Sequence, residues 1–244
     1  MSTLETRKIE PLSGTTVTLG ASGDAVTMPA GATLKTNTVK DAGGNTLWTS
    51  NGSGTLSSVN SGLQGGMVYI STTTVSSSVA TVAITSGITS TYKEYVIYFV
   101  NIHPSEDRRT FRWLPSVNGG SSYGVATTGG GTHAYHKEDD SSGPAISFAG
   151  GMAQNSGGLL LTNECNNEND SSSSGELRLY DPANTTYVKH FQSWGHTDFD
   201  GGSPYSGSWK YGGYVNTTSA VNAIQFKMSS GNIDSGIFYL YGIR

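Results

Sequence analysis

The feature that most constrains this chain is a series of short apolar runs, each separated from the next by turns of Gly, Ser, Asn and Pro. Alternation of apolar and polar residues is the period of a half-buried β-strand, and a helical period is nowhere convincing. The runs occupy residues 67–71, 77–85, 92–104, 109–120, 145–152, 158–163, 175–182, 187–195, 209–216, 220–229 and 236–244. The sequence therefore predicts an all-β chain in which residues 67–244 form an antiparallel, jelly-roll-like β-sandwich head.

The strongest run, YKEYVIYFVNIHP at residues 92–104, is mostly apolar at both sets of alternating positions. Apolar character on both faces predicts a central strand that is buried on both sides. Pro104 ends this run, because proline has no N–H to donate to a neighbouring strand.

The first part of the chain has a different composition. Alternating triplets at 17–19, 26–28 and 32–34 are each too short to form a stable sheet alone. Stacked rungs or neighbouring chains would supply the missing edges, and a small β-meander packed on the main domain is the alternative. Residues 41–66 are rich in Gly, Ser and Asn, which is typical of a linker or a thin stem. We therefore expect a β-rich stem over residues 16–66.

Charge and composition exclude several classes of partner. Only 13% of residues are charged and the net charge is −4, so no basic stripe is available to neutralise the phosphates of a nucleic acid. No apolar run approaches the roughly 20 residues that span a bilayer, and the N-terminus lacks the apolar core of a signal peptide. We expect no membrane insertion and no secretion signal. The single cysteine, Cys165, excludes an internal disulfide, and we expect it on a loop.

Residues 220–244 resemble the C-terminal signature of receptor-type heads on the fibres of marine tailed phages. In that signature a strand ends in Ser-Ser-Gly-Asn, a short turn follows, and a final strand closes with an aliphatic-Tyr-Gly-Ile motif. The matching residues are Ser229, Ser230, Gly231, Asn232, Gly236, Leu240, Tyr241, Gly242 and Ile243. The stretch SGITSTYKEYVIYFVNIHPS at 86–105 is similar to the same family's approach to a long central strand, and GASGDAVTMPAGATL at 20–34 is similar to its stem repeats.

The resemblance implies a homotrimeric virion protein, a tail fibre or a capsid fibre, with a trimeric stem and an outward-pointing head. Residues 1–15 would then anchor the subunit to other virion proteins. The virion would be assembled in the host cytoplasm and released by lysis. The family motif carries no catalytic residue.

The C-terminal residues also have a physical interpretation of their own. Ile224, Phe226 and Met228 stand at alternating positions before the Ser-Ser-Gly-Asn turn, and Ile237, Tyr239 and Tyr241 stand at alternating positions after it. Two such runs with a turn between them predict an antiparallel hairpin with one face in the core.

Groups for catalysis are poorly placed in this sequence. No Gly-x-Ser-x-Gly nucleophile elbow precedes a helix, and the carboxylates that glycan cleavage needs lie mostly in Gly- and Ser-rich loops. The pair His133 and His136 and the series His196, Asp198 and Asp200 match no recognised metal-ligand spacing. We expect no enzyme activity, no catalytic residue, no metal and no cofactor; a structural Ca²⁺ is compatible with the sequence but not indicated by it.

Ligand binding is the better-supported chemistry. The segment SWGHTDFDGGSPYSGSWKYGGY at 193–214 places large aromatic side chains among Gly, Ser and Asp, a mixture that suits recognition of carbohydrate. Its candidate receptor- or glycan-binding residues are Trp194, Asp198, Phe199, Asp200, Tyr205 and Trp209. A second candidate surface is the loop 117–143, with Tyr123 and Tyr135. The alternative is that several of these aromatic rings fill the sandwich core or a trimer interface.

The sequence thus favours a phage virion structural protein, a fibre subunit with a role in attachment to the host surface and a host glycan as its candidate partner. One alternative is a free-standing carbohydrate-binding β-sandwich module, which would bind glycan as a monomer. A polysaccharide-degrading enzyme is the other.

Overall fold

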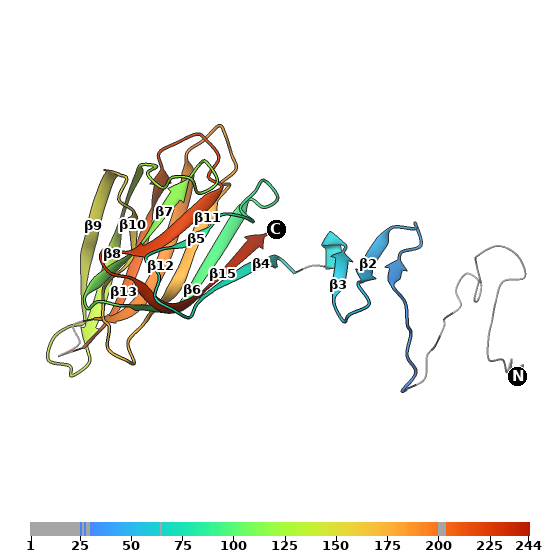
Figure 1. Cartoon of the computed structure of the whole chain (residues 1–244), viewed down its shortest axis with the longest axis horizontal. Coiled ribbons are helices and arrows are strands. Elements are labelled where there is room, and N and C mark those ends of the chain that lie inside the picture. Colours follow the sequence, from blue (N-terminus) through green and yellow to red (C-terminus); the bar gives the residue numbers. More distant parts are fainter. Residues whose placement is uncertain (1–24, 26, 28–29, 64, 200–203) are drawn as a thin grey trace, which may run out of the picture. The chain divides into compact units, whose positions relative to one another are not determined.

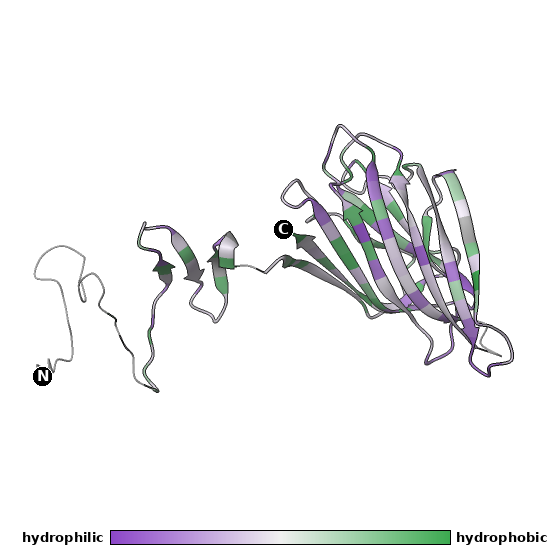
Figure 2. Cartoon of the chain, turned by 180° about the vertical axis from the view of Figure 1, so that it is seen from behind, coloured by the Kyte–Doolittle hydropathy of each residue, from purple (hydrophilic) through white to green (hydrophobic). Residues whose placement is uncertain are grey.

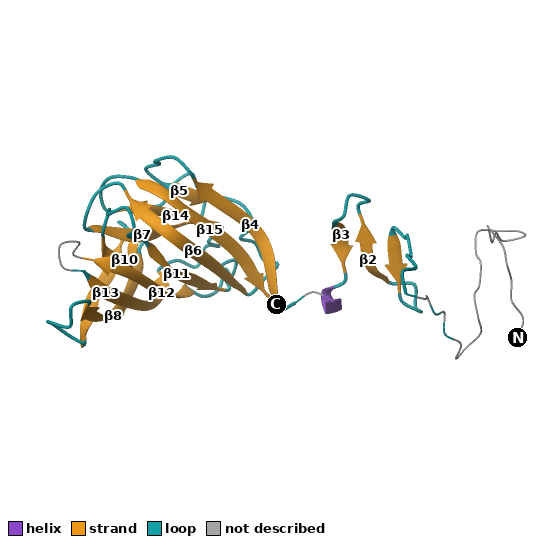
Figure 3. Cartoon of the chain, turned by 90° about the horizontal axis from the view of Figure 1, so that it is seen from below, coloured by secondary structure: helices purple, strands orange, loops and turns teal. Residues whose placement is uncertain are grey.

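The structure, a computed structural model, describes residues 25, 27, 30–63, 65–199 and 204–244. The chain divides into two compact units, Met1–Leu63, the N-terminal unit, and Gln64–Arg244, the head. Regular structure in the described residues is almost entirely strand, with one short 3-10 turn at Ser61–Leu63 (Figures 1 and 3). The predicted all-β fold is confirmed. None of the described residues belongs to a helix of the length and apolar character that crossing a membrane requires.

The described part of the N-terminal unit contains a three-stranded antiparallel sheet in the order β1 (Thr38–Lys40), β2 (Thr46–Ser50), β3 (Leu56–Val59). Of the predicted triplets at 17–19 and 26–28, all but residue 27 lie outside the described residues. The triplet at 32–34 is not a strand, so that part of the prediction is wrong. The strands lie further along the chain, largely within the predicted linker.

Side-chain hydrogen bonds explain why this polar segment folds into hairpins. The carboxylate of Asp41 accepts the backbone N–H of Asn45 at 2.8 Å, and the amide oxygen of Asn51 accepts that of Ser53 at 2.8 Å. Turns of this kind reverse the chain without needing an apolar side chain. The Asn and Asp residues therefore specify tight turns between short strands, where composition alone predicts only a linker.

The head is built from two antiparallel sheets, which contain all the strands of its described residues (Figure 1). The large sheet has the order β4 (Met67–Val75), β15 (Ile233–Ile243), β6 (Glu94–Pro104), β11 (Ser173–Tyr180), β12 (Lys189–Phe199), β13 (Tyr205–Val215), β8 (Thr127–Lys137), β9 (Ala145–Asn155). The small sheet has the order β10 (Leu159–Cys165), β7 (Arg109–Ser116), β14 (Ala223–Met228), β5 (Val82–Ile84). Bands of hydrophilic and hydrophobic residues alternate along the strands (Figure 2).

Aromatic rings from both sheets meet in the core between them. Phe111 of the small sheet lies 5.3 Å from Phe99 of the large sheet, measured between ring centroids, and Trp113 lies 5.1 Å from Phe191. All four side chains are at most 2% exposed. Burial of each ring stabilises the fold by roughly 1.5–3 kcal/mol relative to leaving it in water. The two layers therefore form a β-sandwich.

Glycines on the inner face of the large sheet give these rings room. A Cβ added at Gly175 would lie 2.6 Å from the ring of Phe99, and one at Gly213 would lie 3.0 Å from the ring of Phe191. Backbone oxygens of the neighbouring strands would be 2.2 Å from both added atoms. Glycine normally weakens a strand, but here it permits the close approach of a ring to the backbone.

The strand β6 is central, as its sequence predicts. It lies between β15 and β11 in the large sheet. Val96 and Ile97 point to opposite faces, and both are fully buried. Val96 faces away from the small sheet and is flanked by its register partners Tyr241 and Arg178.

The predicted C-terminal hairpin is wrong. β14 pairs with β5 and β7 in the small sheet, whereas β15 pairs with β4 and β6 in the large sheet. The Ser-Ser-Gly-Asn turn therefore carries the chain from one layer to the other. Ser105 accepts the N–H of Asn232 at 2.8 Å, and Ser230 donates to Glu106 at 3.0 Å, which holds this turn. The alternating residues predicted for the core are also wrong in β15, where Phe238 and Leu240 are buried and Ile237, Tyr239 and Tyr241 are not.

The last strand ends beside the start of the first strand of the head. The backbone N–H of Arg244 donates to the carbonyl of Gly66 at 2.9 Å, and Ile243 pairs with Met67. The chain therefore enters and leaves the head at one corner, as Figure 1 shows.

Candidate ligand-binding site on the large sheet

The outer face of the large sheet is the face turned away from the small sheet. Side chains of β12 alternate between buried and exposed along the strand, and the exposed set points to this face. From strand to strand, the register places one outward-facing residue beside an outward-facing residue of the adjacent strand. We call the resulting line of residues the transverse row. Its members are Tyr239, Tyr98, Glu176, Trp194, Lys210, Thr132 and Phe148, from β15, β6, β11, β12, β13, β8 and β9.

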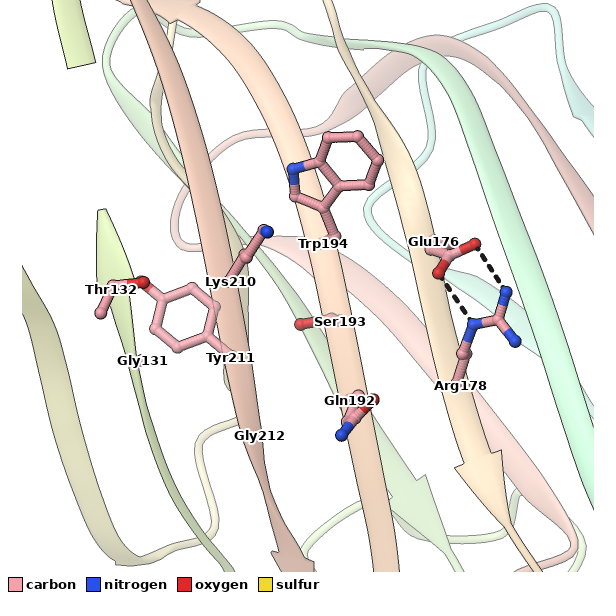
Figure 4. A pocket seen from close by; sticks show the side chains of 10 residues that line it. All are labelled: Gly131, Thr132, Glu176, Arg178, Gln192, Ser193, Trp194, Lys210, Tyr211 and Gly212. Atoms are coloured by element: carbon pink, nitrogen blue, oxygen red, sulfur yellow. Dashed lines mark hydrogen bonds and ion pairs between the residues drawn. The ribbon is translucent and has the colours of Figure 1, made fainter. Parts of the chain in front are cut away.

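A groove of about 480 Å³ lies along the middle of the transverse row (Figure 4). We call it the outer-face groove, and its outward-facing lining is Thr132, Glu176, Arg178, Gln192, Trp194, Lys210 and Gly212. Each of these residues belongs to a strand within the sheet. The groove is therefore built on hydrogen-bonded backbone, which holds its side chains in place better than a loop does.

Trp194 supplies the large aromatic surface of the groove and is 53% exposed. Its Nε1 donates a hydrogen bond to Ser208 Oγ at 2.8 Å, which fixes the orientation of the indole. The ammonium of Lys210 lies 5.7 Å from the ring centroid, within the range of a cation–π interaction. The rest of the ring surface is available to the apolar face of a ligand.

Arg178 lies at one end of the groove in a network of charged groups. It donates from Nε to Glu176 at 2.8 Å and from Nη1 to Glu94 at 2.7 Å. These hydrogen bonds, that to Glu176 above all, raise the pKa of Arg178 and keep it charged. Lys210, in contrast, forms no ion pair with any residue in the described part of the chain.

Among the predicted binding residues that the structure describes, Trp194 lies in the groove, whereas Phe199, Tyr205 and Trp209 do not. Phe199 and Trp209 are buried on the inner face, at 8% and 2% exposure, with Tyr135 and Tyr205 half-buried beside them. The segment is the β12–β13 hairpin, so alternation turns these rings away from Trp194. The prediction that Phe199 and Trp209 meet a ligand on a loop is therefore wrong.

Asp198 and Tyr123 also lie outside the groove. Asp198 faces outward on β12, where its carboxylate accepts hydrogen bonds from Ser171 Oγ and from the N–H of Ser172. Asp200 lies outside the described residues. Tyr123 is half-buried before β8, and burial raises the pKa of its hydroxyl. The predicted loop 117–143 is not one loop, because β8 occupies its middle.

The inner-facing rings form a second small core. His133 stacks on Trp209 with 4.1 Å between ring centroids, and Phe199 stacks on Tyr205 at 4.9 Å. Burial lowers the pKa of His133, although Glu164 opposes the shift, and burial raises the pKa of Tyr211, in the same cluster, to about 12. These are the pKa shifts of enclosed side chains that lack a charged partner in contact.

Metal ligation finds no support in the described residues. His133 and His136 are three positions apart on one strand, so they point to opposite faces, and His136 hydrogen-bonds with Asp140 at 3.1 Å. No group of three or more His, Cys, Asp or Glu side chains within the described ranges is placed to hold a metal ion.

Cys165 is a buried strand residue, in contrast to the loop position predicted for it. It ends β10, and the hydroxyls of Thr162 and Ser173 lie 3.1 Å and 3.0 Å from its sulfur. Burial raises the pKa of the thiol, which keeps it protonated and unreactive.

Further hollows lie on the described part of the head. One of about 450 Å³ has Tyr135, Ile146 and Ser208 in its lining, and two lie elsewhere. The larger of these two, of about 600 Å³, has the exposed Tyr187 and the residues Asn184 and His190 in its wall. The other, of about 390 Å³, is lined mainly by carboxylates, those of Glu138, Glu168, Asp170 and Asp198. The outer-face groove differs from both, because it combines an oriented aromatic ring with polar side chains on adjacent strands.

No known protein family matches the chain, and no characterised protein or solved structure shows significant similarity to it. Sequence reasoning missed Gln192, Arg178 and Lys210 as members of the site. Gln192 is two residues from Trp194, so alternation within one strand places both on the same face. Arg178 and Lys210 become neighbours of Trp194 only once the strand order β11-β12-β13 is known.

Proposed function

We propose that this chain is the subunit of a homotrimeric phage fibre, on the tail or the capsid, whose jelly-roll-like head attaches the virion to a glycan of the host surface. The observation that carries attachment is Trp194, an indole held at one edge by Ser208 and half exposed in a groove on adjacent strands. A concave site with an aromatic wall and a few fixed polar groups is the usual form of a small-ligand site.

A sugar ring fits the chemistry of this groove. Its C–H face would pack on the indole of Trp194, while its hydroxyls would hydrogen-bond with Gln192 and Thr132 on either side. Both oxygens of Glu176 accept hydrogen bonds from Arg178, at 2.8 Å and 3.3 Å. A carboxylate fixed in this way is poorly suited to act as a general acid or base, which favours binding of a glycan over its cleavage.

The trimer is supported by the lack of a buried core in the described part of the N-terminal unit. Leu34, Leu56 and Leu63 are 70%, 55% and 57% exposed, and no described residue of this unit with an assigned burial is buried. A small sheet needs an apolar face covered to be stable. We propose that the same segments of two further copies cover it, and that residues 1–15, outside the described residues, join other virion proteins. The fibre would assemble in the host cytoplasm and leave in the virion on lysis.

Two measurements on the full chain test this function. Binding of the wild type to host surface polysaccharide should be lost on Trp194→Ala and retained on Tyr187→Ala, a matched exposed aromatic outside the groove. Sedimentation analysis should give the mass of a trimer. A monomer that binds glycan through Trp194 would favour the carbohydrate-binding module, and binding that survives Trp194→Ala would contradict the assigned site.

A further inference from the structure

The transverse row continues beyond the groove to a second exposed aromatic ring. Phe148 on the edge strand β9 is 95% exposed, and its register partner is Thr132, which in turn pairs with Lys210 and so aligns with Trp194. Three strand-to-strand steps separate Trp194 from Phe148, a distance of about 14 Å at the usual spacing of strands. The outer face therefore presents two aromatic rings in one line, with an ammonium and a hydroxyl between them.

The outward-facing positions beside this line are glycines, although the packing around them leaves room for a side chain. A Cβ added at Gly212 or Gly130 would meet nothing closer than 3.8 Å and 3.9 Å, and one added at Gly151 would meet nothing within 4 Å. On the inner face the contrast is clear, because a Cβ at Gly131 would lie 2.0 Å from a backbone oxygen. The outward glycines leave a shallow path over β13, β8 and β9 that begins at the outer-face groove.

A contact between copies of the chain is a poor explanation for the exposure of Phe148. Among the residues of β9 with an assigned burial, the exposed large apolar side chains are those of Phe148 and Ile146, at 95% and 78% exposure. A Phe side chain buries at most about 250 Å², whereas a stable protein interface needs about 800 Å² on each partner. The neighbours of Phe148 along the row are the polar Thr132 and the ammonium of Lys210, which has no ion pair in the described residues.

We infer that the outer face binds a linear polysaccharide that crosses strands β12, β13, β8 and β9, with one sugar ring on Trp194 and a later one on Phe148. This rests on the proposed glycan-binding function and specifies its ligand as an extended chain, since a single sugar cannot reach both rings. Lys210 and Thr132 hydrogen-bond the sugars between the two rings. The glycine path lets the chain lie against the backbone of the sheet.

The test is a microarray of size-graded fragments, from monosaccharides to long chains, of linear bacterial O-antigen and capsule polysaccharides, probed with the full chain. Wild-type affinity should rise with fragment length and then level off. Phe148→Ala should lower affinity roughly threefold to tenfold for long fragments, the value of one aromatic contact, and leave short fragments unchanged. Gly130→Val should weaken long fragments in the same way without lowering the melting temperature, and Trp194→Ala should abolish binding at every length.

Each other outcome has a distinct meaning. If Trp194→Ala abolishes binding while Phe148→Ala has no effect at any length, the extended site is wrong and the proposed function stands. If Phe148→Ala changes the mass of the assembled protein, Phe148 contacts another copy and the inference is overturned. If the wild type binds no fragment of any polysaccharide, the proposed glycan-binding function and the extended site both fail.

Discussion

The two faces of the large sheet are made by the same strands, yet they use the same residue types in opposite ways. On the inner face Trp209 is 2% exposed and Gly131 has no room for a side chain. On the outer face Trp194 is 53% exposed, and a Cβ at Gly212 would make only ordinary van der Waals contact. Tryptophan and glycine therefore serve packing on one face and access on the other. Composition alone does not distinguish the two uses; the position of each residue in the alternation does.

The largest expected difference between the faces is in the loss of stability when each of the two tryptophans is replaced by alanine. Trp209→Ala removes a ring enclosed in the second small core and should lower the free energy of unfolding by about 3–5 kcal/mol. Trp194→Ala removes a half-exposed ring with one hydrogen bond and should cost about 1 kcal/mol or less. Urea unfolding followed by far-UV circular dichroism measures both. Equal losses would mean that the assignment of the faces is wrong.

Replacing glycines should also cost more stability on the inner face than on the outer face, but the difference should be smaller. Gly131→Ala places a Cβ against the carbonyl oxygen of Lys210 at 2.0 Å, so β13 and β8 must move apart at a cost of about 1–3 kcal/mol. Gly212→Ala, the matched control, should change stability by no more than about 0.5 kcal/mol. The same urea experiment compares them. Destabilisation by Gly212→Ala would show that the outward path is required by the fold and is not kept open for a ligand.

The smallest expected effect is a pH dependence of stability that arises from His133 on the inner face. Burial lowers the pKa of His133 in the folded state below its ordinary value of 6.5. The unfolded chain therefore binds the proton more readily, so the stability contributed by neutral His133 is full above that value and declines as the pH falls through the folded pKa. His133→Phe should remove this part of the decline. An unchanged decline in the His133→Phe variant would contradict this assignment.

The sequence determined which residues face the core far better than it determined which strands are neighbours. Alternation over 92–104 identified the central strand, and the same alternation separates Trp194 from Phe199, which lie five positions apart. It did not reveal that β14 and β15 belong to different sheets, because both strands have one buried face whichever sheet they join. Pairing between strands depends on contacts between distant residues, and no local pattern records them.

Some elements were missed for local reasons. β8 carries three consecutive glycines from Gly129 to Gly131, a composition typical of a loop, and its inner glycines exist because rings of β12 and β13 lie against them. Cys165 was expected on a loop, although its burial follows from its position in β10. The groove itself needed the strand order, since its charged members come from β11 and β13 while its indole comes from β12.

The hydrogen bond between Arg244 and Gly66 has a practical consequence. The C-terminal residue follows β15 at the β4–β15 edge of the sheet, whereas Trp194 lies three strands away from β15 and Phe148 is on the opposite edge. At the usual spacing of strands, a fluorophore or an affinity tag attached at Arg244 would lie about 14 Å or more from the indole. Such a tag offers a handle for immobilising the protein on a sensor chip while the entire proposed polysaccharide path stays open to solution.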